Sequence, residues 1–243
     1  NRKYLYQQIR DDGYSGVATF QIDQNNGKIS QIGEISLEED SCYVNTDKTG
    51  RFLLAAYLIP GMVTVHKIGD DGAVLQPVVD RKPTELYAHS IVTDSTNRYA
   101  FVPHTAPTDT VYQFLFDNTT GKLEPNFPRK IKTIPEHGPR HIAFHPELDI
   151  IYANSEEASC VTVYSLDKSN GTLNALQTLS TLPDHGFDGE SRNATVRVHP
   201  TGKAIYITNR GHDSISMFSA DTSTGLLTSM GQQITEKCPR TLA

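Results

Sequence analysis

Several residue types that would define a fold or function class are rare or missing. The 243 residues contain no tryptophan, three cysteines and three methionines. No apolar run approaches the roughly 20 residues that a membrane-spanning helix needs, and helical periodicity longer than two turns is absent. Cys42, Cys160 and Cys238 form neither a CxxC pair nor an even-numbered framework, so the sequence predicts reduced thiols and favours a cytoplasmic location.

Charge of one sign is not concentrated anywhere in the chain. The net charge is −6, with acidic and basic residues interspersed. This distribution argues against nucleic acid or an acidic membrane surface as the main partner.

The chain contains a fivefold repeat of β-prone runs separated by polar turns. One turn of each copy is rich in aspartate and closes on a glycine. The five glycines are Gly27, Gly72, Gly121, Gly171 and Gly225. They lie 45, 49, 50 and 54 residues apart, close to the period of a four-stranded β-propeller blade.

Alternation of β-branched and aromatic residues supports this interpretation. Residues 63–68, 161–166 and 214–218 have a period of two and end at turn signals. We therefore expect an all-β propeller of four-stranded blades in one partial domain, residues 1–243. Residues 1–6 resemble the second strand of a copy and residues 239–243 the opening of a first strand, so we expect truncation at both ends.

Alignment of the repeats brings polar residues to equivalent positions. The turns at Asp47, Asp94, Pro146 and Pro200 serve as anchors. In each copy, three positions carry candidate residues. We call these three positions the ring positions. The residues six before each anchor are Ser41, Ala88, Arg140 and Ala194, with Arg240 in the last partial copy. Those five before are Cys42, His89, His141 and Thr195, and those ten after are Tyr57, His104, Glu156 and Arg210.

These positions should converge because the first strand of each blade lines the channel of a propeller. Antiparallel pairing brings the end of the second strand beside the start of the first. We therefore expect Glu156 to lie next to Arg140 and His141. The alternative is a solvated cross-strand pair of Arg and Glu. Several ionisable groups aimed at one axis favour a functional site, because buried charges are costly unless they are paired or used.

Two motifs carry a resemblance to a known family. The segments GPRHIAFHP at 138–146 and NRGHDSI at 209–215, with His89-Ser90-Ile91, Ser155-Glu156 and Pro239-Arg240, resemble the lactonase family of seven-bladed β-propellers. That family contains propeller-type 6-phosphogluconolactonases and 3-carboxy-cis,cis-muconate cyclases. The resemblance covers essentially the whole chain and implies seven blades in the complete protein, about five of them present.

The resemblance also implies site residues and an activity. The family's site residues map onto His89, Arg140, Glu156 and Arg240, and Thr195 stands where many relatives carry an acidic residue. The implied activity is hydrolysis of 6-phosphogluconolactone to 6-phosphogluconate, in the pentose phosphate pathway of carbohydrate metabolism.

The chemistry of these residues suits opening a lactone without a metal or other cofactor. His89 can act as general base, and Arg140 or Arg240 can stabilise an oxyanion. The remaining arginine and Arg210, with His141, can bind the anionic group of a small lactone. Glu156 would orient an arginine or exchange a proton with the ring oxygen.

Other functions stay open on the sequence. A muconate cyclase would use the same groups in the lactonising direction, and a non-enzymatic propeller would bind a partner on its face. The absence of tryptophan disfavours the latter, because aromatic anchors are common in binding surfaces. His137, His141 and His145 would suit a helical metal site, but the flanking prolines and β pattern disfavour one. We expect His104, His185 and His212 on the surface or in loops, and Cys160 as a buried thiol.

Overall fold

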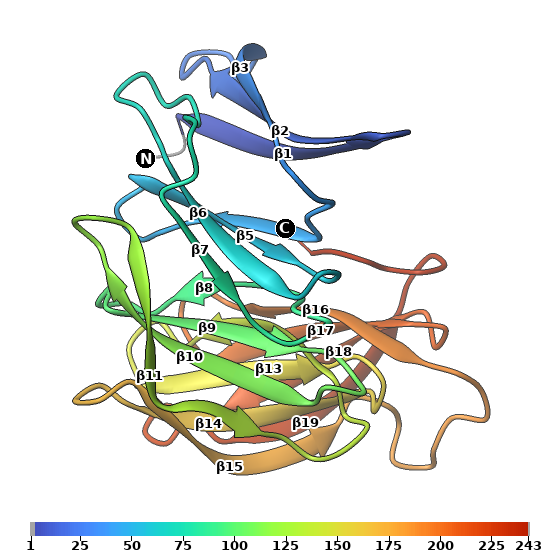
Figure 1. Cartoon of the computed structure of the whole chain (residues 1–243). Helices are drawn as coiled ribbons and strands as arrows, with labels where there is room; N and C mark the ends of the chain where they lie inside the picture. Colours follow the sequence, from blue (N-terminus) through green and yellow to red (C-terminus); the bar gives the residue numbers. More distant parts are fainter. Residues whose placement is uncertain (1–2, 243) are drawn as a thin grey trace. The chain divides into compact units, whose positions relative to one another are not determined.

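The computed structural model describes residues 3–242, and every regular element in that range is a β-strand. The strands form one three-stranded and four four-stranded antiparallel sheets, and each sheet follows the chain order. Figure 1 shows them as successive colour ranges from β1 to β19. Among the described residues no helix is long and apolar enough to span a membrane.

The first two sheets contain seven strands. These strands are β1 (Tyr4–Asp11), β2 (Tyr14–Ile22), β3 (Ile29–Ser36), β4 (Tyr43–Thr46), β5 (Phe52–Tyr57), β6 (Met62–Lys67) and β7 (Asp80–Pro83). The third sheet contains β8 (Val92–Thr93), β9 (Tyr99–His104), β10 (Thr110–Asp117) and β11 (Lys122–Lys132).

The last two sheets contain eight strands. The fourth sheet contains β12 (Pro139–Phe144), β13 (Ile150–Ser155), β14 (Cys160–Asp167) and β15 (Thr172–Ser180). The fifth contains β16 (Arg192–Val198), β17 (Ala204–Arg210), β18 (Ser214–Ala220) and β19 (Leu227–Ile234). Serial four-stranded meanders of this kind are the blades of a β-propeller, and the predicted fold class is confirmed.

The repeated turns lie where the sequence predicts them, and their side chains explain why. Asp47 joins β4 to β5, and its Oδ1 accepts hydrogen bonds from the amides of Arg51 (2.8 Å) and Phe52 (2.9 Å). The glycine turns join third to fourth strands. Gly121 has φ +77°, and a Cβ there would lie 2.5 Å from the Phe52 ring, so both backbone and packing require glycine.

The chain packs as two compact units, Asn1–Val102 with Phe114–Pro125 and Pro103–Gln113 with Asn126–Ala243. In the first unit, one apolar cluster joins Val17 of β2 to Leu53 and Tyr57 of β5. In the second unit, another joins Tyr152 of β13 to Ile207 of β17. Each fully buried large apolar side chain contributes about 1.5–3 kcal/mol to folding, so sheet-to-sheet packing stabilises each unit. That the chain is one partial, truncated propeller domain stays a prediction, and Asn1, Arg2 and Ala243 lie outside the described residues.

Candidate active site

Arg140 occupies a break in the strand ladder at the start of β12. Pro139 pairs with Ser155 and His141 with Asn154, so Arg140 is the extra residue of a β-bulge. A bulge bends the strand and re-aims the side chain that it carries. The Arg140 side chain is only 9% exposed, which means that the bulge directs a guanidinium into the protein rather than into solvent.

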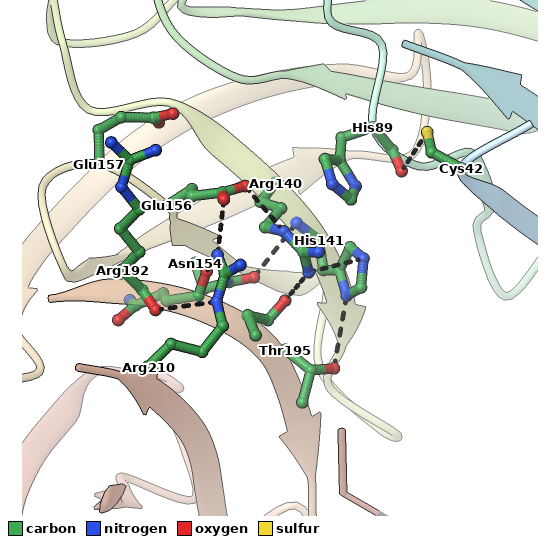
Figure 2. Close-up of polar contacts among 12 residues, drawn as sticks. Cys42, His89, Arg140, His141, Asn154, Glu156, Glu157, Arg192, Thr195 and Arg210 are labelled. Atoms are coloured by element: carbon green, nitrogen blue, oxygen red, sulfur yellow. Dashed lines mark hydrogen bonds and ion pairs between the residues drawn. The ribbon is translucent and has the colours of Figure 1, made fainter. Parts of the chain in front are cut away.

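Glu156 lies between two arginines, as Figure 2 shows. Its Oε2 accepts a hydrogen bond from Arg140 Nε at 2.8 Å, and its Oε1 accepts one from Arg210 Nη2 at 2.5 Å. The contact with Arg140 confirms the predicted proximity across the β12–β13 hairpin. Arg210, at the end of β17, comes from the next sheet, so the carboxylate links two adjacent blades.

Further contacts fix the position of the Arg140 guanidinium. Its Nη1 donates to the carbonyl of Ala194 and lies 3.2 Å from His141 Nε2. Because arginine only donates, His141 Nε2 must be the acceptor in this contact and the His141 proton lies on Nδ1. That proton points to Thr195 Oγ1 at 3.4 Å. His141 therefore supports Arg140 through its Nε2.

Arg240 adds positive charge to the same region. Burial lowers the pKa of the Arg140 guanidinium, the charges of Arg210 and Arg240 lower it further, and Glu156 opposes them. Arg240 is exposed. Arg140, Arg210, Arg240 and Arg192 against Glu156 and Glu157 leave an excess of positive charge, which suits an anionic ligand. The roles assigned to Arg140, His141, Glu156, Arg210 and Arg240 stay predictions.

His89 lies in the first unit, immediately before β8, and is half-buried. Its carbonyl is 3.5 Å from the Cys42 thiol, as Figure 2 also shows. Its placement beside the arginines of the second unit stays a prediction.

A buried amide network next to Arg210 was not predicted from the sequence. Asn193 is fully buried and donates to the carbonyl of Cys160 at 3.0 Å, while its own side-chain oxygen accepts from Thr181 Oγ1 at 3.0 Å. Asn209 donates to Thr181 O at 3.1 Å and to Ser216 Oγ at 2.8 Å. The available signal was an asparagine beside a ring position in both β16 and β17.

The predictions for Cys160 and His104 have opposite outcomes. Cys160 is buried as predicted, and burial raises the pKa of its thiol. His137 Nδ1 lies 3.2 Å from its Sγ. The prediction that His104 lies on the surface is wrong, because His104 is 0% exposed and its ring packs on Tyr112 at 4.8 Å. The end of β9 is a core position.

Comparisons with known proteins place this sequence in a family. The sequence matches the family described as "Lactonase, 7-bladed beta-propeller" over residues 1–243. A 6-phosphogluconolactonase of Pectobacterium carotovorum is 34% identical over 241 residues, covering 99% of this chain and 70% of the relative. The 6-phosphogluconolactonase of Bacillus subtilis is 30% identical, covering 97% and 69%. The solved periplasmic gluconolactonase of Pseudomonas aeruginosa superposes with a TM-score of 0.89 at 24% identity, covering 99% of this chain and 72% of that one, which shows the shared fold.

Proposed function

Because the chain belongs to the lactonase family of seven-bladed β-propellers, we propose that it hydrolyses 6-phosphogluconolactone to 6-phosphogluconate. It is a carboxylic ester hydrolase. The single observation that carries the assignment to this site is the carboxylate of Glu156 held between the guanidinium groups of Arg140 and Arg210.

Hydrolysis of a lactone requires stabilisation of the negative charge that develops on the carbonyl oxygen. Water adds to the carbonyl carbon, the bond from that carbon to the ring oxygen breaks, and the proton from water ends on the ring oxygen. Arg140 is suited to the charge-stabilising role because Glu156, His141 and the Ala194 carbonyl hold it in place. A fixed positive charge stabilises an oxyanion without reorganising during the reaction.

The remaining arginines suit the phosphate of the substrate. Arg240 is exposed and makes no hydrogen bond or ion pair with the residues described, so its guanidinium can bind a phosphate bidentately. Arg210 adds a second positive charge next to Glu156. His141 is not suited to be the general base, because its Nε2 accepts from Arg140. We assign that role to His89.

The names of the relatives imply the pentose phosphate pathway. We place the enzyme in the cytoplasm, which its three free cysteines favour.

A side-by-side assay of the purified protein tests this proposal. The substrates are 6-phosphogluconolactone, unphosphorylated gluconolactone and 3-carboxymuconolactone, each corrected for spontaneous hydrolysis. We expect the largest kcat/KM for the phosphorylated lactone. A preference for gluconolactone would show that the phosphate is not recognised. Activity only with 3-carboxymuconolactone would identify a cyclase. No turnover of any of the three substrates would contradict the proposal that the protein is an enzyme.

A further inference from the structure

The turns between the second and third strands of four repeats share two backbone features. One residue in each turn has a positive φ and a carbonyl that accepts an amide from the segment after the fourth strand. These residues are Gly61 (φ 78°), Asp109 (φ 50°), Ser159 (φ 45°) and Asp213 (φ 54°). The donors are Thr84, Thr133, Thr181 and Thr235, at 2.8 to 2.9 Å. The four turn residues are therefore structurally equivalent, and their side chains can be compared directly.

The carboxylate of Asp109 holds the loop that precedes Arg140. Its Oδ2 accepts from the amide of Glu136 at 2.8 Å, and its Oδ1 accepts from the amide of Gly138 at 2.7 Å. Asp109 is buried, so these are largely desolvated hydrogen bonds to a charged acceptor, the strong class. Gly138 lies two residues before Arg140.

The carboxylate of Asp213 makes the corresponding contact two repeats later. Its Oδ1 accepts from the amide of Cys238 at 2.9 Å, and Cys238 lies two residues before Arg240. The same oxygen accepts from Gly211 at 3.0 Å. These amides lower the pKa of Asp213, which keeps it ionised. Gly138 and Cys238 also share a positive φ, 64° and 57°.

The Gly138 peptide also contacts the other half of the Arg140 ion pair. Its carbonyl accepts a hydrogen bond from the amide of Glu156 at 2.7 Å. Gly138 has φ +64°, and a Cβ there would lie 2.9 Å from the backbone nitrogen of Ala106, so this position favours glycine. The Gly138 peptide, held by Asp109, therefore links the backbones that carry Arg140 and Glu156.

The side chain in the turn correlates with the residue at the ring position that follows it. The two aspartate turns precede the two arginines, Arg140 and Arg240. The Gly61 turn precedes Ala88, and the Ser159 turn precedes Ala194. The Ser159 side chain also contacts the segment before its ring position, but as a donor, from its Oγ to the carbonyl of Ser191 at 2.8 Å. Among these four turns, a carboxylate acceptor stands only in the two that precede an arginine.

We propose that Asp109 and Asp213 are positioning residues that hold Arg140 and Arg240, respectively, through the amide of the residue two before each arginine. The proposal rests on the proposed function and adds to it. Two remote carboxylates set the positions of the oxyanion-stabilising and phosphate-binding arginines separately.

A crossed set of double variants tests this proposal with 6-phosphogluconolactone as substrate. Asp109→Asn keeps the size of the side chain but removes its charge and replaces one of its two acceptor oxygens by an NH2 donor. It should lower kcat roughly 10- to 100-fold, as expected for a misplaced catalytic group. In an Arg140→Ala background this loss should disappear, whereas in an Arg240→Ala background it should persist. Asp213→Asn should instead raise KM, and only the Arg240→Ala background should abolish that effect.

Asp221→Asn is the matched control, because Asp221 accepts the amides of Ser223 (2.9 Å) and Thr224 (2.7 Å) within its own turn. It should leave kcat and KM unchanged. Asp109→Ser installs the residue of the next repeat and should behave like Asp109→Asn. The proposal would be overturned if Asp109→Asn lowered kcat equally in the Arg140→Ala and Arg240→Ala backgrounds. It would also be overturned if Asp109→Asn had no larger effect than Asp221→Asn.

A spectroscopic readout separates this proposal from the proposed function. In protein labelled with ¹⁵N-arginine, Asp109→Asn should shift the Nε resonance of Arg140 and leave that of Arg240, and Asp213→Asn should do the reverse. These shifts are expected even if no lactone is hydrolysed, in which case only the proposed function fails. Unchanged resonances of both arginines would overturn the positioning role.

Discussion

At the scale of single residues, the site depends on one carboxylate that neutralises two arginines. The Glu156 and Arg210 side chains are 14% exposed, and that of Arg140 is 9% exposed. Removal of one partner from a buried ion pair is strongly destabilising because the remaining charge stays buried without compensation. The three side chains therefore act as a unit, in which Glu156 makes the close approach of two guanidinium groups possible.

Glu156→Gln should lower the free energy of unfolding by about 3–5 kcal/mol and also reduce kcat/KM. Urea denaturation measures the first and steady-state kinetics the second. Asp40→Asn is the control, because its ion pair with Arg10 joins side chains that are 53% and 60% exposed. Such exposed pairs contribute about 0–1 kcal/mol. If Glu156→Gln and Asp40→Asn lowered the free energy of unfolding equally, Glu156 would not be compensating buried charge.

The protonation of His141 is a second expectation at this scale. Arg140 donates to Nε2, so the ring should carry its proton on Nδ1. The ¹⁵N shifts of the His141 ring report the tautomer directly. Arg140→Ala should change the shifts of Nε2, whereas Thr195→Val should change those of Nδ1. A doubly protonated ring at neutral pH would contradict the contact.

At the scale of elements, a recurring stabilising feature is an aspartate that accepts hydrogen bonds from the backbone of its own turn, as Asp47 does between β4 and β5. Asp47 is 2% exposed. Burial alone would raise its pKa, but hydrogen bonds from Thr49, the Phe52 amide and Asn97 lower it below its ordinary value overall. A carboxylate whose pKa is lowered on folding adds stability above its unfolded pKa of about 4, and that stability is lost as the pH falls through the folded value.

Asp47→Asn should therefore lower the free energy of unfolding by about 1–3 kcal/mol at pH 7, because it weakens buried hydrogen bonds to a charge. As the pH falls from about 4 through the lower pKa of folded Asp47, the variant and the parent should converge, since the charge of Asp47 is then lost in both states. Denaturant titrations at pH 7 and pH 3 make this comparison. A stability difference that does not depend on pH would show that the Asp47 charge plays no part.

The sequence predicts the strands and turns well but not the local breaks between them. Regular spacing of Gly27 to Gly225 locates the hairpins because the turns need a positive φ and a side-chain acceptor. The sequence does not reveal the bulge at Arg140, because the hydrogen-bonding register between β12 and β13 determines which residue is left unpaired. The clamp of Asp109 on Gly138 joins residues from different repeats, which no short motif encodes.

At the scale of the whole molecule, the described residues contain no group of three or more His, Cys, Asp or Glu placed to hold a metal ion. The charge-stabilising role is assigned to arginine instead. We expect lactonase activity to survive prolonged dialysis against a chelator. Loss of activity that Zn²⁺, Ca²⁺ or Mg²⁺ restores would require a different site.

We propose that this member of the lactonase family uses Arg140 to stabilise the oxyanion of lactone hydrolysis. The most direct test is the kcat of Arg140→Ala on 6-phosphogluconolactone, with Arg129→Ala as a control at an exposed arginine beside Tyr112. Loss of an oxyanion donor costs about 3 kcal/mol, so kcat should fall roughly 10² to 10³-fold with Arg140→Ala and stay unchanged with Arg129→Ala. A raised KM with normal kcat would make Arg140 a substrate anchor, and normal values of both in a stably folded variant would contradict the claim.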